Sequence, residues 1–131
     1  MYNVSIVGAG QLGSRHLQAL CLTELEVNIT VIDPNEGARV EARSRFDSMP
    51  SNERVRSIVF SRTVEDLPSV IHLCIVSCCA DARRRVIEEV LRVAVVENFL
   101  LEKNLFQRVA DYEAIGSEIA KLGVKTWVNC P

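Results

Sequence analysis

Three glycines near the start of the chain have the spacing of a nucleotide-binding turn. Gly8, Gly10 and Gly13 form the pattern G-x-G-x-x-G in VSIVGAGQLGSRHLQAL, directly after an apolar run and directly before an amphipathic one. In such a turn the first glycine permits a tight bend, the second lets the backbone approach a pyrophosphate, and the third lets the helix pack on the strand. The pyrophosphate is expected to bind the free N–H groups at Gln11 and Leu12. No G-K-[ST] sequence follows, which excludes a P-loop.

An acidic residue ends the second apolar run. Asp33 closes the segment VNITVID, 20 residues beyond the last glycine. A carboxylate at this place accepts hydrogen bonds from the ribose hydroxyls of an adenosine and repels a 2′-phosphate. Pro34 follows in place of an arginine, which favours NAD over NADP, although Arg39 and Arg43 lie on the next predicted helix. The alternative is that the glycines only make a tight turn and that Asp33 caps a helix beginning near Asn35.

The composition excludes several classes of protein. The chain has 131 residues, 48% apolar and 24% charged, which predicts one globular domain with a sizeable core. Its net charge of −2 argues against nucleic acid as a partner. No apolar stretch reaches the ~18 residues of a membrane span, and no secretory signal precedes the first apolar run. We therefore expect a soluble, cytoplasmic protein.

Cysteine and histidine offer no metal site. The five cysteines are odd in number and include no C-x-x-C pair, and three of them crowd into the apolar run VIHLCIVSCC, so we expect buried free thiols. Neither His16 nor His72 has a second ligand at metal spacing.

Apolar runs alternate with amphipathic stretches along the chain. The runs predict strands at residues 4–7, 27–32, 57–60, 70–76, 99–101 and 124–128. The stretches predict helices at residues 11–22, 35–46, 81–93 and 105–122. This alternation predicts an α/β fold with a doubly wound parallel sheet, a Rossmann fold with about six strands in the order 3-2-1-4-5-6.

Local signals add detail to this outline. Asn104 is predicted to cap the last helix with Gln107 as its capping-box partner, and Gly123 to end it. Residues 62–68 are long enough for only a turn of helix. Trp127 is expected in the core of the last strand.

Two groups of basic residues are expected to be structural. Arg83, Arg84 and Arg85 are consecutive and fan out around a helix, so we expect a solvated face, with an anion contact from one of them as the alternative. After the glycine turn, Arg15 is expected at the surface and His16 against a neighbouring strand or loop.

With these features the chain resembles the Gfo/Idh/MocA oxidoreductases, which include glucose–fructose oxidoreductase and inositol dehydrogenase, over essentially all of its length. The segment GAGQLGSRH matches the opening G-x-G-x-x-G-x-x-H of their N-terminal domain, and an acid ends strand two. IVSCC stands where a Thr-Pro turn follows strand four, and LLEKNL stands where strand five ends in Glu-Lys-Pro. The pair Glu102-Lys103 carries most of the resemblance, because many Rossmann proteins share the opening motif.

The resemblance implies roles for four residues. Ser77 and Cys78 are expected along the nicotinamide side of the cofactor. Lys103 is expected to be catalytic, because a cation near the nicotinamide ribose and the substrate hydroxyl assists proton removal during hydride transfer. Glu102 is expected to support it at the cofactor. The alternative for Lys103 is a solvated lysine at a strand end. The implied substrate is the hydroxyl of a sugar, nucleotide sugar or cyclitol.

Several positions depart from the family pattern. Asn104 replaces the proline of Glu-Lys-Pro, which leaves the backbone after Lys103 less restrained. Ser77 and Cys78 replace the Thr-Pro turn, and a histidine that often follows corresponds to Ala82 or Arg83. These changes indicate a divergent member in which cofactor binding survives better than turnover.

Family members also carry a second domain that binds substrate. The 131 residues are expected to form the dinucleotide-binding domain alone, with VNCP near the crossing into the second domain. The chain is therefore expected to bind cofactor without completing a reaction, and the full-length form to be a homo-oligomer. The alternative function is an NAD(H)-sensing regulatory module, which has no need of a catalytic lysine.

Overall fold

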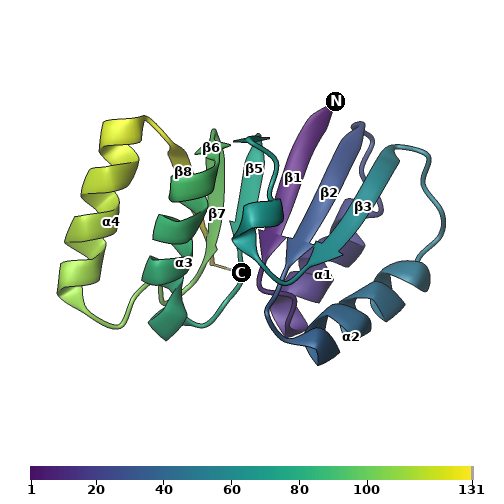
Figure 1. Ribbon diagram of the computed structural model, residues 1–131, viewed down its shortest axis with the longest axis horizontal. Coiled ribbons are helices and arrows are strands. Elements are labelled where there is room, and N and C mark those ends of the chain that lie inside the picture. Colours follow the sequence, from purple (N-terminus) through teal and green to yellow (C-terminus); the bar gives the residue numbers. More distant parts are fainter. Residues whose placement is uncertain (131) are drawn as a thin grey trace.

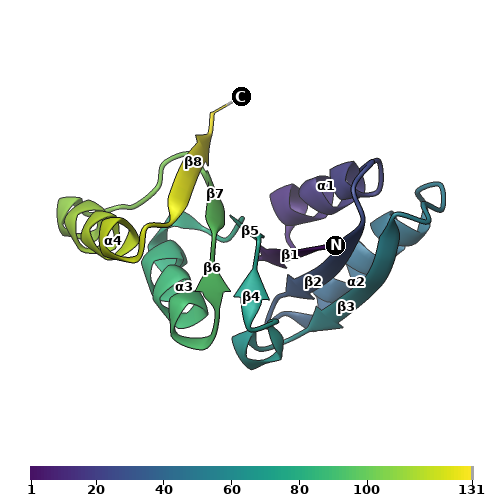
Figure 2. The same ribbon diagram turned by 90° about the horizontal axis from the view of Figure 1, so that it is seen from above.

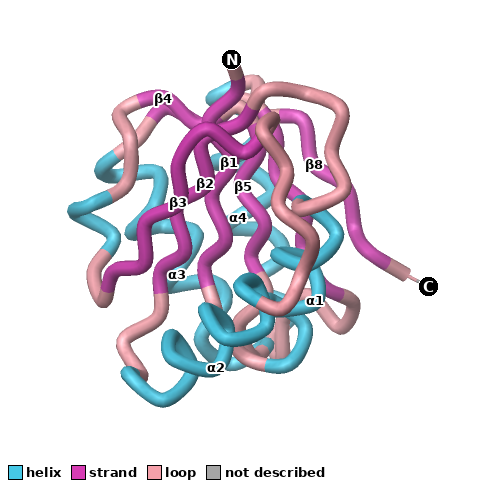
Figure 3. Tube along the Cα trace, turned by 90° about the vertical axis from the view of Figure 1, so that its right-hand side faces the viewer, coloured by secondary structure: helices cyan, strands magenta, loops and turns pink. Residues whose placement is uncertain are grey.

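Apolar strands form a parallel six-stranded sheet at the centre of the computed structural model, which describes residues 1–130 (Figure 1). The strands are β1 (Tyr2–Val7), β2 (Val27–Ile32), β3 (Val55–Ser61), β5 (Leu73–Val76), β7 (Asn98–Glu102) and β8 (Lys125–Asn129). They lie in the order β3-β2-β1-β5-β7-β8, and every pair is parallel. This order confirms the predicted doubly wound topology. Figure 3 shows β1, β2, β3 and β5 side by side.

Helices cover both faces of the sheet (Figure 2). On one face, α1 (Gln11–Leu20) and α2 (Glu36–Asp47) bury Leu17 and Ala42 against the apolar side chains of β1 and β2. On the other face lie the single-turn helix η1 (Val64–Asp66), α3 (Ala80–Val93) and α4 (Val109–Leu122). Strands buried on both faces require continuous apolar sequence, which is why the apolar runs predicted these strands.

The fourth predicted strand is divided at His72. Residues 70–76 form β4 (Val70–Ile71) and β5, because the His72 ring Nδ1 accepts the backbone N–H of Asn3 at 2.9 Å in place of a carbonyl. The short β4 pairs with β6 (Val95–Val96) in a separate two-stranded sheet. Two-residue strands leave no periodic pattern, so the prediction missed β6 and the division.

The predicted start of the last helix is wrong. Asn104 has a left-handed φ of 56° and caps no helix, and α4 begins only at Val109. Phe106 is buried in the core at this point, so the chain runs inward before the helix can begin. The end is as predicted, because Gly123 has the left-handed φ of 69° typical of a helix C-cap.

The prediction for the cysteines is only partly correct, and the prediction for Trp127 is wrong. All five cysteines are free, and Cys21 and Cys74 are buried as expected, but Cys79 and Cys130 are exposed. Trp127 is 53% exposed rather than in the core, because β8 is the edge strand of the sheet. No helix among residues 1–130 is both long and apolar enough to cross a membrane.

A carboxylate on α4 ties this helix to α3. Asp111, which is 7% exposed, accepts a hydrogen bond from Arg84 of α3 at 2.8 Å and another from Arg108 at 3.2 Å. These hydrogen bonds, chiefly that of Arg84, hold the pKa of Asp111 below its ordinary value of 3.8. A carboxylate with a lowered pKa stabilises the fold at pH values above its ordinary pKa, and this contribution disappears as the pH falls through the lowered value.

We therefore expect Asp111→Asn to lower the free energy of unfolding at neutral pH. Below about pH 4 this loss is expected to shrink progressively, because the wild-type carboxylate also becomes protonated. The measurement is the free energy of unfolding in urea at several pH values. Glu118→Gln, at an exposed carboxylate of the same helix, is the control. A destabilisation by Asp111→Asn that stays constant down to pH values where Asp111 is protonated contradicts this account.

Candidate functional site

The residues with predicted chemical roles come together at the carboxyl edge of the sheet. The glycine turn joins β1 to α1, and Asp33 follows β2. Ser77 follows β5, and Lys103 follows β7. The strand order reverses between β1 and β5, so the connections leave this point toward opposite faces, and ligands of open α/β sheets bind at such a point. In Figure 1 this edge is the lower one.

Gly8 and Gly13 allow an approach that no side chain permits. Gly8 has a φ of 103°, and a Cβ there would lie 2.7 Å from the backbone N of Cys78. A Cβ at Gly13 would lie 1.7 Å from the carbonyl oxygen of Gly8. The glycine turn, α1 and the turn after β5 therefore meet in direct backbone contact.

Gly10, by contrast, faces open space. A Cβ at this position would meet no atom within 4 Å, and its φ of −67° is ordinary for any residue. As the N-cap of α1 it offers no side-chain acceptor, and the first turn holds no acidic residue. In α2 the equivalent position is filled by Asn35, whose side chain accepts from the N–H of Ala38. The chain thus leaves the amino end of α1 open and without a side-chain cap, which suits an anion.

Asp33 links the end of β2 to the glycine turn. Its Oδ2 accepts the N–H of Ala9 at 2.7 Å, and its Oδ1 accepts the N–H of Asn35 at 2.8 Å. Each carboxylate oxygen has a second lone pair, so these contacts leave acceptor capacity for hydroxyl groups. Arg39 donates to the backbone carbonyl of Asp33 at 2.6 Å. Asp33 can therefore hold the following turn and still accept hydrogen bonds from a ribose.

A hollow of about 330 Å³ opens beside Asp33. It lies between the ends of β1 and β2, the segment around η1, and α3. Pro34, Arg62, Thr63 and Arg85 are among its lining residues. Sequence reasoning missed this hollow, because its walls come from elements far apart in the chain.

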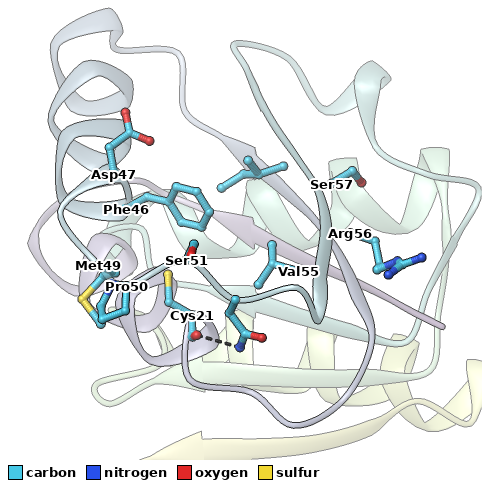
Figure 4. Close-up of a pocket in the computed structure, with 11 residues that line it drawn as sticks. Cys21, Phe46, Asp47, Met49, Pro50, Ser51, Val55, Arg56 and Ser57 are labelled. Carbon is cyan, nitrogen blue, oxygen red and sulfur yellow. Dashed lines mark hydrogen bonds between the residues drawn. The ribbon is translucent and has the colours of Figure 1, made fainter.

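A larger hollow, of about 420 Å³, lies at the opposite edge of the sheet (Figure 4). It is enclosed by the end of α2 with Phe46, the following loop with Met49 and Pro50, and the start of β3. The dashed line in Figure 4 marks the hydrogen bond that the Cys21 carbonyl accepts from Asn52 at 2.8 Å. None of the residues with predicted chemical roles lines this hollow.

Ser77 and Cys78 lie against the glycine turn. The Ser77 hydroxyl donates to the carbonyl of Gly8 at 2.7 Å, which fixes the turn after β5 to the turn after β1. Cys78 is half-buried, and burial raises the pKa of its thiol, so the thiol is protonated at neutral pH. The site thereby holds a small neutral side chain at this position.

Glu102 and Lys103 are adjacent in sequence and differ in surroundings. Glu102 is 5% exposed, and its carboxylate lies 2.5 Å from Nε2 of His16 on α1. Asn129 of β8 donates to the same carboxylate at 3.3 Å. His16 thus packs against a strand end, as expected, and joins α1 to β7. Lys103 is exposed at the same edge.

Arg83 is another residue whose predicted placement is wrong. Its side chain is 3% exposed and donates to the backbone carbonyls of Glu102, at the end of β7, and Cys78, in the turn after β5. A solvated helix face was expected. A signal was present, because Arg83, Ile87 and Val90 have the i, i+4, i+7 spacing of one buried helix face. Among the described residues no group of three or more His, Cys, Asp or Glu side chains could hold a metal ion.

A protein-family model matches nearly the whole chain. The family model GFO_IDH_MocA, an oxidoreductase family with an NAD-binding Rossmann fold, matches residues 2–130. No curated protein sequence matches the chain.

Solved structures share the fold at low identity. A Gfo/Idh/MocA family oxidoreductase from Vibrio cholerae is 11% identical with a TM-score of 0.75, over 98% of this chain and 38% of that one. The apo scyllo-inositol dehydrogenase from Lactobacillus casei is 15% identical with a TM-score of 0.69, over 98% and 36%. GenD2 from gentamicin A biosynthesis, in complex with NAD, is 18% identical with a TM-score of 0.72, over 98% and 34%. The chain spans about a third of the length of these proteins.

The steric difference between the glycines predicts that an alanine costs much more unfolding free energy at Gly13 than at Gly10. Gly13→Ala forces a methyl group into the Gly8 carbonyl and is expected to cost about 3 kcal/mol of unfolding free energy. Gly10→Ala meets no atom and is expected to cost about 1 kcal/mol at most, the usual penalty of alanine at a helix N-cap. Urea unfolding of both variants measures this, and equal costs at the two positions contradict the described turn.

Proposed function

The chain belongs to the Gfo/Idh/MocA oxidoreductase family, and from this premise we propose that it is the domain that binds NAD(H) in a dehydrogenase of carbohydrate-like hydroxyl groups. One observation carries the proposal. The open amino end of α1 at Gly10 lies next to Asp33, which is held there by the N–H of Ala9 at 2.7 Å. An anion site and a ribose acceptor therefore occur side by side at the switch point of the sheet.

The residues present fit a dinucleotide. We assign the pyrophosphate to the backbone of Gly10, Gln11, Leu12 and Gly13, because a Cβ at Gly10 would extend into open space. We assign the adenosine ribose to Asp33 and the adenine to the adjacent hollow of about 330 Å³. The nicotinamide half is assigned to the other side of the glycine turn, next to Ser77 and Cys78.

The surroundings of Asp33 favour NAD over NADP. Its carboxylate repels a 2′-phosphate, and the first two arginines of the following helix, α2, have other partners. Arg39 binds the backbone carbonyl of Asp33 at 2.6 Å, and Arg43 stacks over the ring of Phe60 at 4.3 Å. Neither guanidinium is therefore free to bind a 2′-phosphate without losing a contact.

When bound, NAD supplies a hydride acceptor at its nicotinamide ring. We propose that Lys103 holds or removes the proton of the substrate hydroxyl at its Nζ atom, as a general acid–base. Glu102 supports this lysine from inside the fold, because its contact with His16 at 2.5 Å fixes the end of β7 against α1. Ser77 holds the opposing turn in place through the Gly8 carbonyl.

The substrate class is proposed from the relatives. A scyllo-inositol dehydrogenase and a protein of gentamicin A biosynthesis share the fold over 98% of this chain, and the chain covers 36% and 34% of their lengths. We propose a polyhydroxylated substrate whose contacts come mainly from a second domain, and a homo-oligomer as the full-length form. Membership of an oxidoreductase family favours this function over a sensing module.

Cofactor binding is tested by calorimetric titration with NADH and NADPH. Gly10→Ala is expected to lower NADH affinity by about tenfold or more, since its methyl group enters the pyrophosphate site. Gly116→Ala, at a glycine of α4 that also faces open space, is the matched control. Equal NADH affinity in Gly10→Ala and the wild-type chain would show that the glycine turn is not the pyrophosphate site.

Cofactor preference is tested at Asp33. Asp33→Ala is expected to weaken NADH binding by about 10- to 100-fold, because a hydrogen bond to a charged group is worth roughly 1.5–3 kcal/mol. NADPH binding is expected to weaken less, because a repulsion is removed together with the hydrogen bonds. Asp47→Ala removes the same charge at the far end of α2 and is the control. An unchanged ratio of NADH to NADPH affinity contradicts the assignment.

The role of Lys103 predicts a different pattern. Lys103→Met is expected to leave NADH affinity within about threefold, and to lower kcat by about 100-fold or more in a protein that joins this domain to its substrate domain. Titration and steady-state kinetics measure the two effects. A normal kcat with a raised KM would assign Lys103 to substrate binding instead.

A further inference from the structure

Arg83 lies buried in the first turn of α3. Its Nη1 donates to three backbone carbonyls, those of Glu102 at 3.1 Å, Asn104 at 2.9 Å and Leu105 at 2.9 Å. Its Nη2 donates to the carbonyl of Cys78 at 2.8 Å. One side chain thus binds the turn after β5 and the loop after β7, the two segments that flank the assigned nicotinamide half.

This placement of a cation is costly. Arg83 is 3% exposed, lies at the positive end of the dipole of α3, and has a buried Nε–H without a partner. Among residues 1–130 it forms no ion pair with a carboxylate, so four carbonyl groups alone offset the loss of hydration. A shorter or apolar side chain would suit the buried face of α3 at lower cost. The hydrogen bonds that it donates to these carbonyls explain why a guanidinium occupies this position.

Two of those carbonyls flank Lys103 in the sequence. The carbonyls of Glu102 and Asn104 belong to the residues immediately before and after it, so the backbone is held on both sides of the lysine. The φ of 56° at Asn104 excludes a proline, whose ring requires about −65°. The covalent restraint of a Glu-Lys-Pro sequence is therefore incompatible with this loop.

We propose that Arg83 is a positioning residue that replaces this covalent restraint by hydrogen bonds and holds Lys103 at the nicotinamide half of the site. The inference rests on the proposed function, because it gives Arg83 a role only through Lys103 and the bound cofactor. It also explains why Asn104 takes a left-handed conformation, which lets its carbonyl reach the same Nη1 atom as its neighbours.

The test compares Arg83→Met, Arg83→Lys and the control Arg84→Met in the whole chain. Met removes all the donors, Lys retains a cation with three donors, and the control removes the neighbouring arginine, whose partners are Glu88 and Asp111. Two quantities are measured for each. The first is amide hydrogen exchange in residues 103–108 and in residues 8–13. The second is the affinity for NADH and for ADP-ribose, which lacks the nicotinamide.

For Arg83→Met we expect exchange in residues 103–108 to rise by about tenfold or more, with residues 8–13 unchanged. NADH affinity is expected to fall by about tenfold, because Arg83 also holds the turn at Cys78 against the nicotinamide half, a contact that Lys103→Met leaves intact. ADP-ribose affinity is expected to stay within about twofold, because this nucleotide does not reach that half of the site. Arg83→Lys is expected to fall between Met and wild type in both quantities. Arg84→Met is expected to lower stability without either change.

Two results would overturn the proposal. One is unchanged exchange in residues 103–108 relative to residues 8–13 in both Arg83 variants. The other is an equal loss of NADH and ADP-ribose affinity, which would reduce Arg83 to a general structural residue. If Arg83→Met does not fold, the same comparisons in Arg83→Lys decide. A wild-type chain that binds neither nucleotide would contradict the proposed function, while the exchange result still decides whether Arg83 holds the loop.

Discussion

The site depends on one steric constraint, the direct backbone contact between Gly8 and Gly13. A Cβ at Gly13 would lie 1.7 Å from the Gly8 carbonyl, and a Cβ at Gly8 would lie 2.7 Å from the backbone N of Cys78. Because neither glycine carries a side chain, α1 begins directly after the carboxyl end of β1. For the same reason the turn after β5 packs against the glycine turn and the start of α1. As a result, the amino end of α1 opens at the switch point of the sheet.

Polar contacts between loops then fix the groups around this point. Asp33 holds the glycine turn to β2 through the N–H of Ala9, and Ser77 holds it to β5 through the carbonyl of Gly8. On the β7 side, the contact of His16 with Glu102 and the four hydrogen bonds of Arg83 serve the same purpose. Loops at the edge of a sheet have few apolar contacts, so these hydrogen bonds take the place of core packing.

The sequence predicted what local pattern determines and missed what depends on distant contacts. The strand order and the meeting of the glycine turn with Asp33 follow from buried apolar runs and from motif spacing. The start of α4 was mispredicted, because Phe106 is buried before the helix begins and the Asn104 carbonyl accepts a hydrogen bond from a guanidinium 21 residues earlier in the chain. The division of residues 70–76 likewise depends on a hydrogen bond between His72 and Asn3, 69 residues away. A charged residue at a buried helical position, Arg83, was the one available sign of such a contact.

The measurement that tests the central claim most directly is NADH titration of the isotopically labelled chain, followed by the chemical shifts of its backbone amides. We expect the largest shifts in residues 9–13, with further shifts at Asp33, Ser77 and Lys103. Shifts confined to the hollow of about 420 Å³ beside Phe46 and Met49, or no shifts at any NADH concentration, would contradict a dinucleotide site at the glycine turn.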